Sequence, residues 1–154
     1  LLAGIEAQGT AVVRVLLHVG PGTFAPVRCE DPRQHVLDPE YCTVDAAAAE
    51  TIRAVRARGG RAVAVGTTVV RTLETAAEAS GQVQAWEGES AKFICPPYRF
   101  AAVDVLLTNF HLPRSSLLLL VAAFAGRELV LHAYAEAVRA GYRFYSYGDA
   151  MLIL

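Results

Sequence analysis

The sequence has little of several features that mark particular classes of protein. Its three cysteines, Cys29, Cys42 and Cys95, form no CxxC pair and do not lie at zinc-ligand spacing from a pair of histidines. A zinc site is therefore not predicted, and free thiols in a reducing cytoplasm are expected. The most apolar run, Leu117 to Ala125, is too short for a transmembrane helix, which needs about 20 residues.

The net charge is also small. Fourteen basic and fifteen acidic residues give a formal charge of -1, so the chain lacks the strongly basic balance typical of nucleic-acid-binding domains. The basic residues are nearly all arginines, with Lys92 as the one lysine. Arginine suits bidentate contacts to phosphate or carboxylate, but a biased genome produces the same composition. Charge alone therefore predicts no particular ligand.

What the chain does have is apolar surface to bury. Hydrophobic residues make up 54% of the sequence and charged residues 19%, values typical of a folded domain rather than a disordered segment. Its length fits one domain. The first residue is Leu1 rather than Met, and the last residues, Met151 to Leu154, continue an apolar strand pattern. We therefore expect the chain to be part of a longer protein.

Periodicity and breakers predict alternating strands and helices. The expected strands are Thr10–His18, Glu40–Val44, Arg61–Val65 and Val103–Thr108, with weaker strand signals at Val83–Gly88 and Lys92–Cys95. The expected helices are Leu1–Ala7, Ala46–Arg58, Val69–Ser80, Leu117–Ala125 and Glu128–Ala140. Asp45 is the expected N-cap of the second helix, and Ser115 or Ser116 that of the fourth.

This alternation predicts the α/β class, with a mostly parallel or mixed sheet and flanking helices. The strands are nearly continuous apolar runs, as in sheets that helices cover on both faces. Parallel α/β sheets bind ligands beyond the carboxyl ends of their strands. Polar residues at those positions are therefore candidate binding residues.

Two polar clusters contain glycine. The first, His18 to Phe24, includes Gly20, Gly22 and Thr23; glycines there let the backbone approach a ligand and adopt positive φ, although a tight turn explains them equally well. The second is Gly66-Thr67-Thr68, followed by Arg71 and Glu74. Free N–H groups, two hydroxyls and a helix N-terminus suit an anion or ribose oxygens. Alternatively, a threonine only caps the helix and Arg71 pairs with Glu74.

Two further clusters carry titratable groups. Thr108-Asn109-Phe110-His111 follows a predicted buried strand, where an amide and an imidazole are costly unless they are hydrogen-bonded. The other is Tyr145 to Asp149, which includes Tyr147 and Gly148. Asp149 suits a base or a ligand for a ribose diol, or else caps a backbone N–H in a turn. His35 and His132 have no such context, and His132 is expected on a helix surface.

Several stretches match one known family in order and spacing. They are His18 to Phe24, Glu40-Tyr41, Gly66-Thr67-Thr68 with Arg71 and Leu73-Glu74, Thr108 to Pro113, Ala123 to Gly126, and Tyr142 to Met151. On these residues the whole chain resembles the S-adenosylmethionine:tRNA ribosyltransferase-isomerases of queuosine biosynthesis. The TNFHLP and SYGDAM stretches are specific in combination, whereas GTT or GPG alone would not be.

The resemblance implies the following activity. The family transfers the ribosyl group of S-adenosylmethionine to a 7-aminomethyl-7-deazaguanine base in the tRNA anticodon and isomerises it, which gives epoxyqueuosine and releases adenine and methionine. S-adenosylmethionine is thus a consumed substrate, tRNA is the partner, and neither a metal nor a cofactor is implied. Residues 1–154 would be the C-terminal part of the α/β domain of a cytoplasmic enzyme without a membrane segment, with a β-barrel in the N-terminal half.

The resemblance also suggests roles for residues. His111 or Asp149 would move protons, and Asn109 would bind substrate oxygen or base edges. Thr67, Thr68 and Arg71 would hold a methionine carboxylate or a tRNA phosphate. The loop Gly20, Gly22, Thr23 and Phe24 would line the nucleoside pocket, with Glu40, Tyr41, Thr108, Phe110, Tyr147 and Gly148 as further substrate-binding residues.

Two other classes of function remain as alternatives. A non-catalytic or degenerate tRNA-binding paralogue is one, because the chain departs from the family pattern at Pro21, Asp38-Pro39 and Pro97. An S-adenosylmethionine-dependent methyltransferase is the other, although the order of motifs fits it poorly.

Overall fold

The structure, a computed structural model, describes all 154 residues. The helices are α1 (Leu2–Glu6), α2 (Ala46–Ala57), α3 (Thr67–Ala76), α4 (Ser116–Ala125) and α5 (Arg127–Arg139). The strands are β1 (Leu16–Leu17), β2 (Glu40–Val44), β3 (Val63–Val65), β4 (Trp86–Ser90), β5 (Val105–Asn109) and β6 (Ala150–Ile153). Three 3₁₀ turns complete the elements: η1 (Pro21–Phe24), η2 (Pro32–Gln34) and η3 (Tyr145–Tyr147).

Local sequence signals explain where two helices begin. The Asp45 carboxylate accepts a hydrogen bond from the Ala48 N–H at 2.7 Å, so Asp45 caps α2 as expected. The Ser115 hydroxyl accepts from the Leu118 N–H at 3.1 Å and caps α4. Gly66 joins β3 to α3 at φ 102°, a backbone conformation that glycine adopts without steric cost.

The strands form two three-stranded sheets. One has the order β1-β2-β4 and is antiparallel throughout. The other has the order β3-β5-β6, in which β3 and β5 run parallel and β6 runs antiparallel to β5. The α/β class and the mixed pairing are therefore confirmed. Of the two expected kinds of sheet, mostly parallel or mixed, the structure has the mixed one, because β3 and β5 are the one parallel pair.

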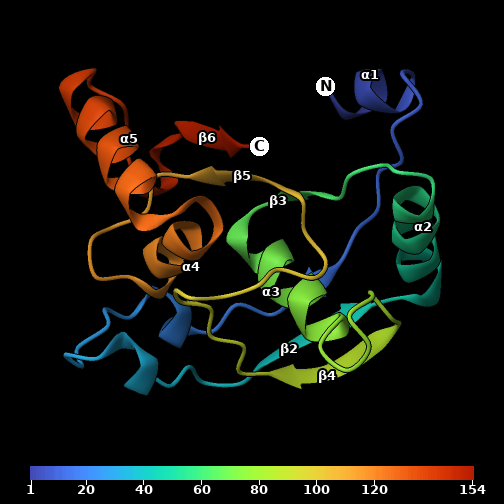
Figure 1. The fold of residues 1–154 in the computed structure, drawn as a ribbon, viewed down its shortest axis with the longest axis horizontal. Coiled ribbons are helices and arrows are strands. Elements are labelled where there is room, and N and C mark those ends of the chain that lie inside the picture. The colour runs from blue at the N-terminus through green and yellow to red at the C-terminus, as the bar shows by residue number, and fades with distance from the viewer.

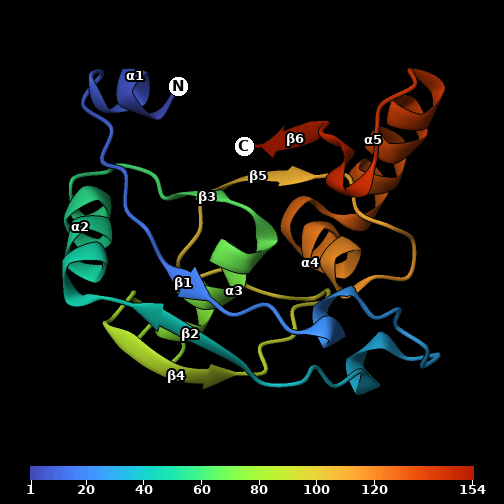
Figure 2. The same cartoon turned by 180° about the vertical axis from the view of Figure 1, so that it is seen from behind.

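Helix α3 lies between the two sheets and contacts strands of both (Figures 1 and 2). Eight of its ten residues are buried. Its Val70 and Leu73 share one hydrophobic core with Val44 from the antiparallel sheet and Leu106 from the mixed sheet. A helix buried on nearly all sides has no free face, so its polar side chains must find partners inside the protein.

The mixed sheet is covered on one face within this chain. Ala64 and Leu106 have no exposed surface and pack into the core. On the other face, Val65 and Leu152 lie on either side of Leu107 in the register, and they are 64% and 56% exposed. The expected cover on both faces is therefore not present here, although the strands have the apolar residues that such cover would bury.

Two expected strands were overestimated. The apolar run Thr10–His18 forms a strand only at Leu16–Leu17, and Lys92–Cys95 forms none. Strand formation needs a hydrogen-bonding neighbour, and an apolar run does not reveal whether one is present. The weaker signal at Val83–Gly88 corresponds to β4, shifted by a few residues.

The cysteines are free: Cys42 is buried, and Cys29 and Cys95 are partly buried. Taken singly, the helices are too short or too polar to cross a bilayer, and the one pair that passes on length and composition, α4 with α5, is bent by 115°.

Candidate functional site

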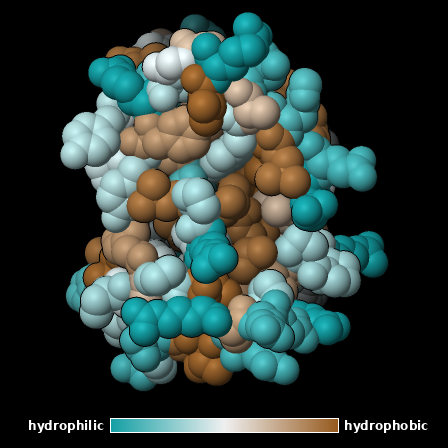
Figure 3. All heavy atoms as spheres, turned by 90° about the vertical axis from the view of Figure 1, so that its left-hand side faces the viewer, coloured by the Kyte–Doolittle hydropathy of each residue, from teal (hydrophilic) through white to brown (hydrophobic).

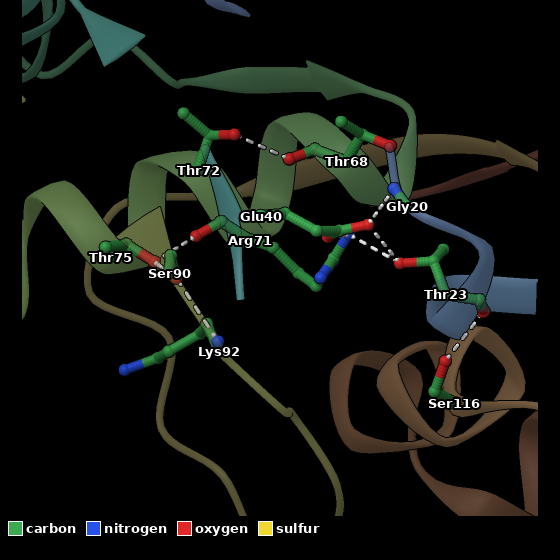
Figure 4. Close-up of polar contacts among 10 residues, drawn as sticks. All are labelled: Gly20, Thr23, Glu40, Thr68, Arg71, Thr72, Thr75, Ser90, Lys92 and Ser116. Carbon is green, nitrogen blue, oxygen red and sulfur yellow. Dashed lines mark hydrogen bonds and ion pairs between the residues drawn. The ribbon is translucent and has the colours of Figure 1, made fainter. Parts of the chain in front are cut away.

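A buried ion pair connects β2 to α3. Glu40 and Arg71 are each 4% exposed, and the Arg71 guanidinium donates from Nη2 to the Glu40 carboxylate. The same carboxylate accepts from the Gly20 N–H at 2.7 Å and from the Thr23 hydroxyl at 2.8 Å. Arg71 Nη2 also donates to Thr23 Oγ1 at 3.0 Å. Figure 4 shows these groups around one point, where the pair holds the loop 20–23 against α3.

The loop that the pair holds is the 3₁₀ turn η1. Pro21 is its first residue, a position where a fixed φ and a missing N–H are compatible with a helical turn. Gly20 has φ -87° and Gly22 is not left-handed, so the expected positive φ is not found in this loop. The Ser116 hydroxyl at the start of α4 donates to the Thr23 carbonyl at 3.2 Å. The loop is thus fixed from three elements.

The Gly66-Thr67-Thr68 cluster forms the N-terminus of α3. Gly66 is the N-cap and no side chain caps the helix, so the first-turn N–H groups have no intrahelical partner. The alternative in which Thr67 or Thr68 caps the helix is therefore wrong. The Gly66 N–H donates to the Leu107 carbonyl at 2.8 Å, which places this cluster beside the end of β5. An anion or a ribose would find donors there.

Glu74 has a role that the sequence did not indicate. The expected alternative, an ion pair with Arg71, is wrong. Glu74 is 1% exposed, and its carboxylate accepts from the Ala101 N–H at 3.0 Å, the Ala102 N–H at 2.9 Å and the Tyr98 hydroxyl at 3.1 Å. Burial raises the pKa of Tyr98, which keeps its hydroxyl able to donate. Glu74 therefore fixes the segment that leads into β5, through partners about 25 residues away in sequence.

His111 is buried beside Thr108 at the end of β5. It is 5% exposed, and its Nε2 is hydrogen-bonded to Thr108 Oγ1 at 3.0 Å. Burial lowers the pKa of His111 to about 4, so the imidazole is neutral at pH 7. The His111 N–H donates to the Tyr134 hydroxyl of α5 at 2.8 Å. The imidazole Nε2 and the backbone N–H of His111 thus both have partners inside the chain, which offsets part of the cost of burying them.

Asn109 and Phe110 hold the segment 142–147 in place. The Asn109 amide donates to the Tyr145 carbonyl at 2.9 Å, and the Tyr145 N–H donates to the Phe110 carbonyl at 2.7 Å. The buried Phe110 ring contacts the rings of Tyr134, Tyr142 and Phe144, with centroids 5.2 to 5.6 Å away. Aromatic contacts of this geometry add to burial energy. The two candidate clusters are therefore one packed unit.

Asp149 lies at the C-terminal end of that unit and accepts hydrogen bonds from Arg143. Its carboxylate accepts from the Arg143 N–H at 2.6 Å and from the Arg143 guanidinium at 3.3 Å. Hydrogen bonds from the Arg143 side chain hold the pKa of Asp149 below its usual value, so the group is ionised at neutral pH. Gly148 beside it has φ 113°. The geometry is that of the turn-capping alternative, and a catalytic role for Asp149 remains a prediction.

The four polar clusters of the sequence meet around the end of β5. Gly66 bonds to Leu107, and Thr23 bonds to Ser116 just after the His111 loop. The Phe24 ring meets the Tyr145 ring edge-on, with centroids 5.9 Å apart. Segments separated by more than 100 residues therefore form one neighbourhood of loops and turns.

The comparisons with known proteins bear on this neighbourhood. The sequence model of the family described as queuosine biosynthesis protein matches residues 1–153. The chain belongs to this family. It is 62% identical over its full length to the S-adenosylmethionine:tRNA ribosyltransferase-isomerase of Moorella thermoacetica, and 57% identical to that of Symbiobacterium thermophilum. The chain spans 45% of the length of each of these curated relatives.

A solved structure from the queuosine biosynthesis family has the same fold. The crystal structure of the S-adenosylmethionine tRNA ribosyltransferase from Thermotoga maritima aligns with a TM-score of 0.81 at 46% sequence identity. The alignment covers 99% of this chain and 48% of that one. The resemblance that the sequence motifs suggested is thus confirmed at the level of family and fold.

One predicted site residue, Tyr41, lies apart from the rest. Along β2, Glu40 and Cys42 are buried toward α3, and Tyr41 between them faces the opposite side of the sheet. The Tyr41 hydroxyl donates to Glu87 at 2.8 Å, and its ring lies 5.4 Å from the ring of His18. A shared site for Tyr41 and Glu40 would need a ligand that reaches both faces of the sheet.

Two cavities of this chain lie away from the neighbourhood at the end of β5. A cavity of about 460 Å³ lies between α2 and the residues Gly81 to Val83. Another, of about 420 Å³, lies beside β4 and Tyr98. The predicted site residues line neither of these two cavities. No group of three or more histidine, cysteine or acidic residues has metal-ligand geometry.

The buried pair predicts a strongly non-additive effect on stability. Glu40→Gln leaves the Arg71 charge buried without a carboxylate and should lower the free energy of unfolding by about 3–5 kcal/mol. The double variant Glu40→Leu with Arg71→Met removes both charges. It should lower the free energy of unfolding by much less than the sum of the single variants Glu40→Leu and Arg71→Met. Urea denaturation measures each value. Glu136→Gln, which breaks the exposed pair with Arg139, is the control and should change stability by less than about 1 kcal/mol. Additive single and double variants would contradict this account of the pair.

His111 predicts a pH-dependent stability. An unfolded imidazole titrates near pH 6.5, whereas burial lowers the pKa of His111 to about 4. Between these values the unfolded chain binds more protons, so the free energy of unfolding falls as the pH falls from about 6.5 to about 4. Between about pH 7.5 and pH 5 this group accounts for a loss of about 2 kcal/mol.

Denaturation of the wild type and His111→Gln at both pH values checks this prediction. In the variant, the free energy of unfolding should no longer fall by the amount assigned to His111. The fall caused by the other titratable groups should remain. His132→Gln, which changes an exposed histidine on α5, should keep the wild-type pH dependence. An unchanged pH dependence in His111→Gln would show that this histidine is not the neutral buried group.

Proposed function

We propose that this chain supplies one part of an enzyme that transfers the ribosyl group of S-adenosylmethionine to 7-aminomethyl-7-deazaguanine in tRNA and isomerises it to epoxyqueuosine. Adenine and methionine are the released products. The observation that carries the proposal is the meeting of four polar clusters at the end of β5, in a chain of the queuosine biosynthesis family. The two relatives are S-adenosylmethionine:tRNA ribosyltransferase-isomerases by name.

The chemistry assigns different tasks to the clusters. The carbon beside the sulfonium must lose a proton to act as a nucleophile, and the departing adenine must gain one. His111 and Asp149 are both in the proton-accepting form at pH 7, because burial lowers the pKa of His111 to about 4 and Arg143 lowers that of Asp149. Both side chains therefore suit the role of general base better than that of general acid. We propose His111 as the base, with Asn109 binding a substrate oxygen.

The remaining residues would position the substrates. The free N–H groups and hydroxyls of Thr67 and Thr68 suit the methionine carboxylate or a tRNA phosphate. Arg71 would contribute indirectly, by holding the loop 20–23 in position, since its Nη2 atom already donates hydrogen bonds to Glu40 and Thr23. That loop, from Gly20 to Phe24, would line the nucleoside pocket, with Thr108, Phe110, Tyr147 and Gly148 around it.

The other part of the longer family chain would complete the site. We propose that it carries a β-barrel and covers the exposed face of the mixed sheet, where Val63, Val65 and Leu152 lie open. S-adenosylmethionine is a consumed substrate in this reaction, and we propose no resident cofactor or metal. The tRNA substrate assigns the enzyme to the cytoplasm.

Labelled substrate tests the proposed reaction. The chain is joined to the part of the Moorella thermoacetica relative that it does not cover, and it is supplied with tRNA that carries the aminomethyl base. S-adenosylmethionine is labelled in the ribose in one reaction and in the methyl group in another. Ribose label should enter the tRNA and methyl label should not, with release of adenine. The 154-residue chain alone should show little or no transfer.

Other outcomes would support other functions. Methyl label in the tRNA would identify a methyltransferase. Tight tRNA binding without release of adenine would identify a non-catalytic binding protein. Robust transfer by the 154-residue chain alone would overturn the proposal that the site needs a second part.

A substitution tests the proposed base. In the joined protein, His111→Gln should keep S-adenosylmethionine binding and slow product formation by about a hundredfold or more, the usual effect of losing a general acid or base. Because His111 is buried, a denaturation curve at pH 7.5 must show that the variant is folded. The matched variant His132→Gln should turn over at the wild-type rate. Near wild-type turnover of His111→Gln would exclude this histidine as the base.

A further inference from the structure

Tyr145 has a backbone conformation that residues other than glycine rarely adopt. Its φ is 63°, and Arg114 at 57° is the other non-glycine residue with positive φ. Such conformations persist when neighbouring contacts hold them, and they cluster at functional sites. For Tyr145 the contacts are the hydrogen bonds with Phe110 and Asn109 described above, at 2.7 and 2.9 Å. The fold therefore holds this tyrosine in one fixed position.

The held tyrosine is partly buried and lies next to two exposed rings. Phe24 meets the Tyr145 ring edge-on at 5.9 Å and is 53% exposed. Tyr147, at the end of the same 3₁₀ turn, is 75% exposed. We call Phe24, Tyr145 and Tyr147 the aromatic shelf. The Phe110 ring packs against Phe144, which supports the segment, while the Phe24 and Tyr147 rings remain exposed to solvent.

Arginines lie next to the shelf. The Arg114 carbonyl accepts from the Val27 N–H at 2.7 Å, three residues after Phe24, and its side chain is exposed and in no ion pair. The Arg143 guanidinium is exposed beside Asp149. The side of the molecule with α4, α5 and the loop 20–38 shows apolar side chains in a band between polar margins (Figure 3). Aromatic rings and arginines thus occur together on this side of the fold.

We infer that the aromatic shelf stacks on an unpaired base of an RNA loop, with Arg114 at a neighbouring phosphate. Proteins read single-stranded RNA by stacking splayed bases on aromatic rings and by binding the backbone with arginine. A base within a duplex presents no free face to such rings. The inference rests on the proposed function and deepens it, because it assigns the RNA substrate to the rings of Phe24 and Tyr147 at the exposed edge of the proposed nucleoside pocket.

The surroundings favour RNA over a docked protein segment. The neighbours of the shelf include the charged groups Arg114, Arg143 and Asp149, and arginines beside aromatic rings suit an RNA backbone and its bases better than an apolar protein segment. Stacking uses ring faces and tolerates such neighbours. The chain as a whole has a charge of -1, so general attraction to RNA is weak and local contacts must provide the affinity.

A fluorescent base tests the shelf in the 154-residue chain. Two short RNA hairpins carry 2-aminopurine, one in the loop and one in the stem. Binding should change the fluorescence of the loop probe and leave that of the stem probe unchanged. Phe24→Leu and Tyr147→Leu keep an apolar side chain but remove the ring, and each should weaken binding by about 5- to 150-fold. Arg114→Gln should weaken binding and reduce its dependence on salt.

Matched variants and two outcomes complete the test. Leu131→Ala removes exposed apolar surface on α5, and Arg58→Gln removes an exposed charge at the end of α2; both should bind as the wild type does. Wild-type affinity in the two leucine variants, or equal responses from the loop and stem probes, would overturn the inference. A response of the loop probe without ribosyl transfer in the joined protein would support the shelf and contradict the proposed reaction. Ribosyl transfer without a response of the loop probe would support the reaction and contradict the shelf.

Discussion

Glu40 and Arg71 are charged side chains in an interior where neither has access to water. A buried carboxylate or guanidinium is tolerable only when each finds opposite charge and further hydrogen-bond partners. Here those partners are the Gly20 N–H and the Thr23 hydroxyl. The need to satisfy the pair therefore determines the position of the loop 20–23 relative to α3. The first turn of α3 and the loop 20–23 would otherwise be independent surface segments, and the pair makes them two sides of one site.

Local signals in the sequence predicted the ends of elements well. Asp45 and Ser115 cap helices because a short polar side chain reaches the first free N–H groups of its own chain. Thr108 to His111 was correctly placed at a strand end, because an apolar run followed by polar residues is also a local signal. The partners of Glu74 were missed, because Ala101 and Ala102 are distant in sequence and offer only backbone N–H groups, which have no residue signature. The opposite placement of Glu40 and Tyr41 follows from the alternation of side chains along the predicted strand, and the prediction of both as substrate-binding residues did not take it into account.

The division into two sheets was missed for a related reason. An apolar strand reveals that it will be buried but not what will bury it. Val63, Val65 and Leu152 have the composition of covered residues and are open in a chain that spans 45% of its curated relatives. The expectation of cover on both faces came from composition, and within these 154 residues the cover is present on one face. The site residues likewise line neither of the two cavities described above.

Helix α3 binds to its surroundings through two charged residues one turn apart. Arg71 fixes β2 and the loop 20–23, and Glu74 fixes the segment before β5. Because these contacts reach two separate segments of the chain, α3 cannot be replaced by the helix of a distant relative on its own. A recombinant that imported the helix without matching residues at positions 40 and 98 to 102 would bury two unmatched charges. The region from β2 to β5 should therefore be inherited as a block, and crossover points that leave a functional protein should lie outside it.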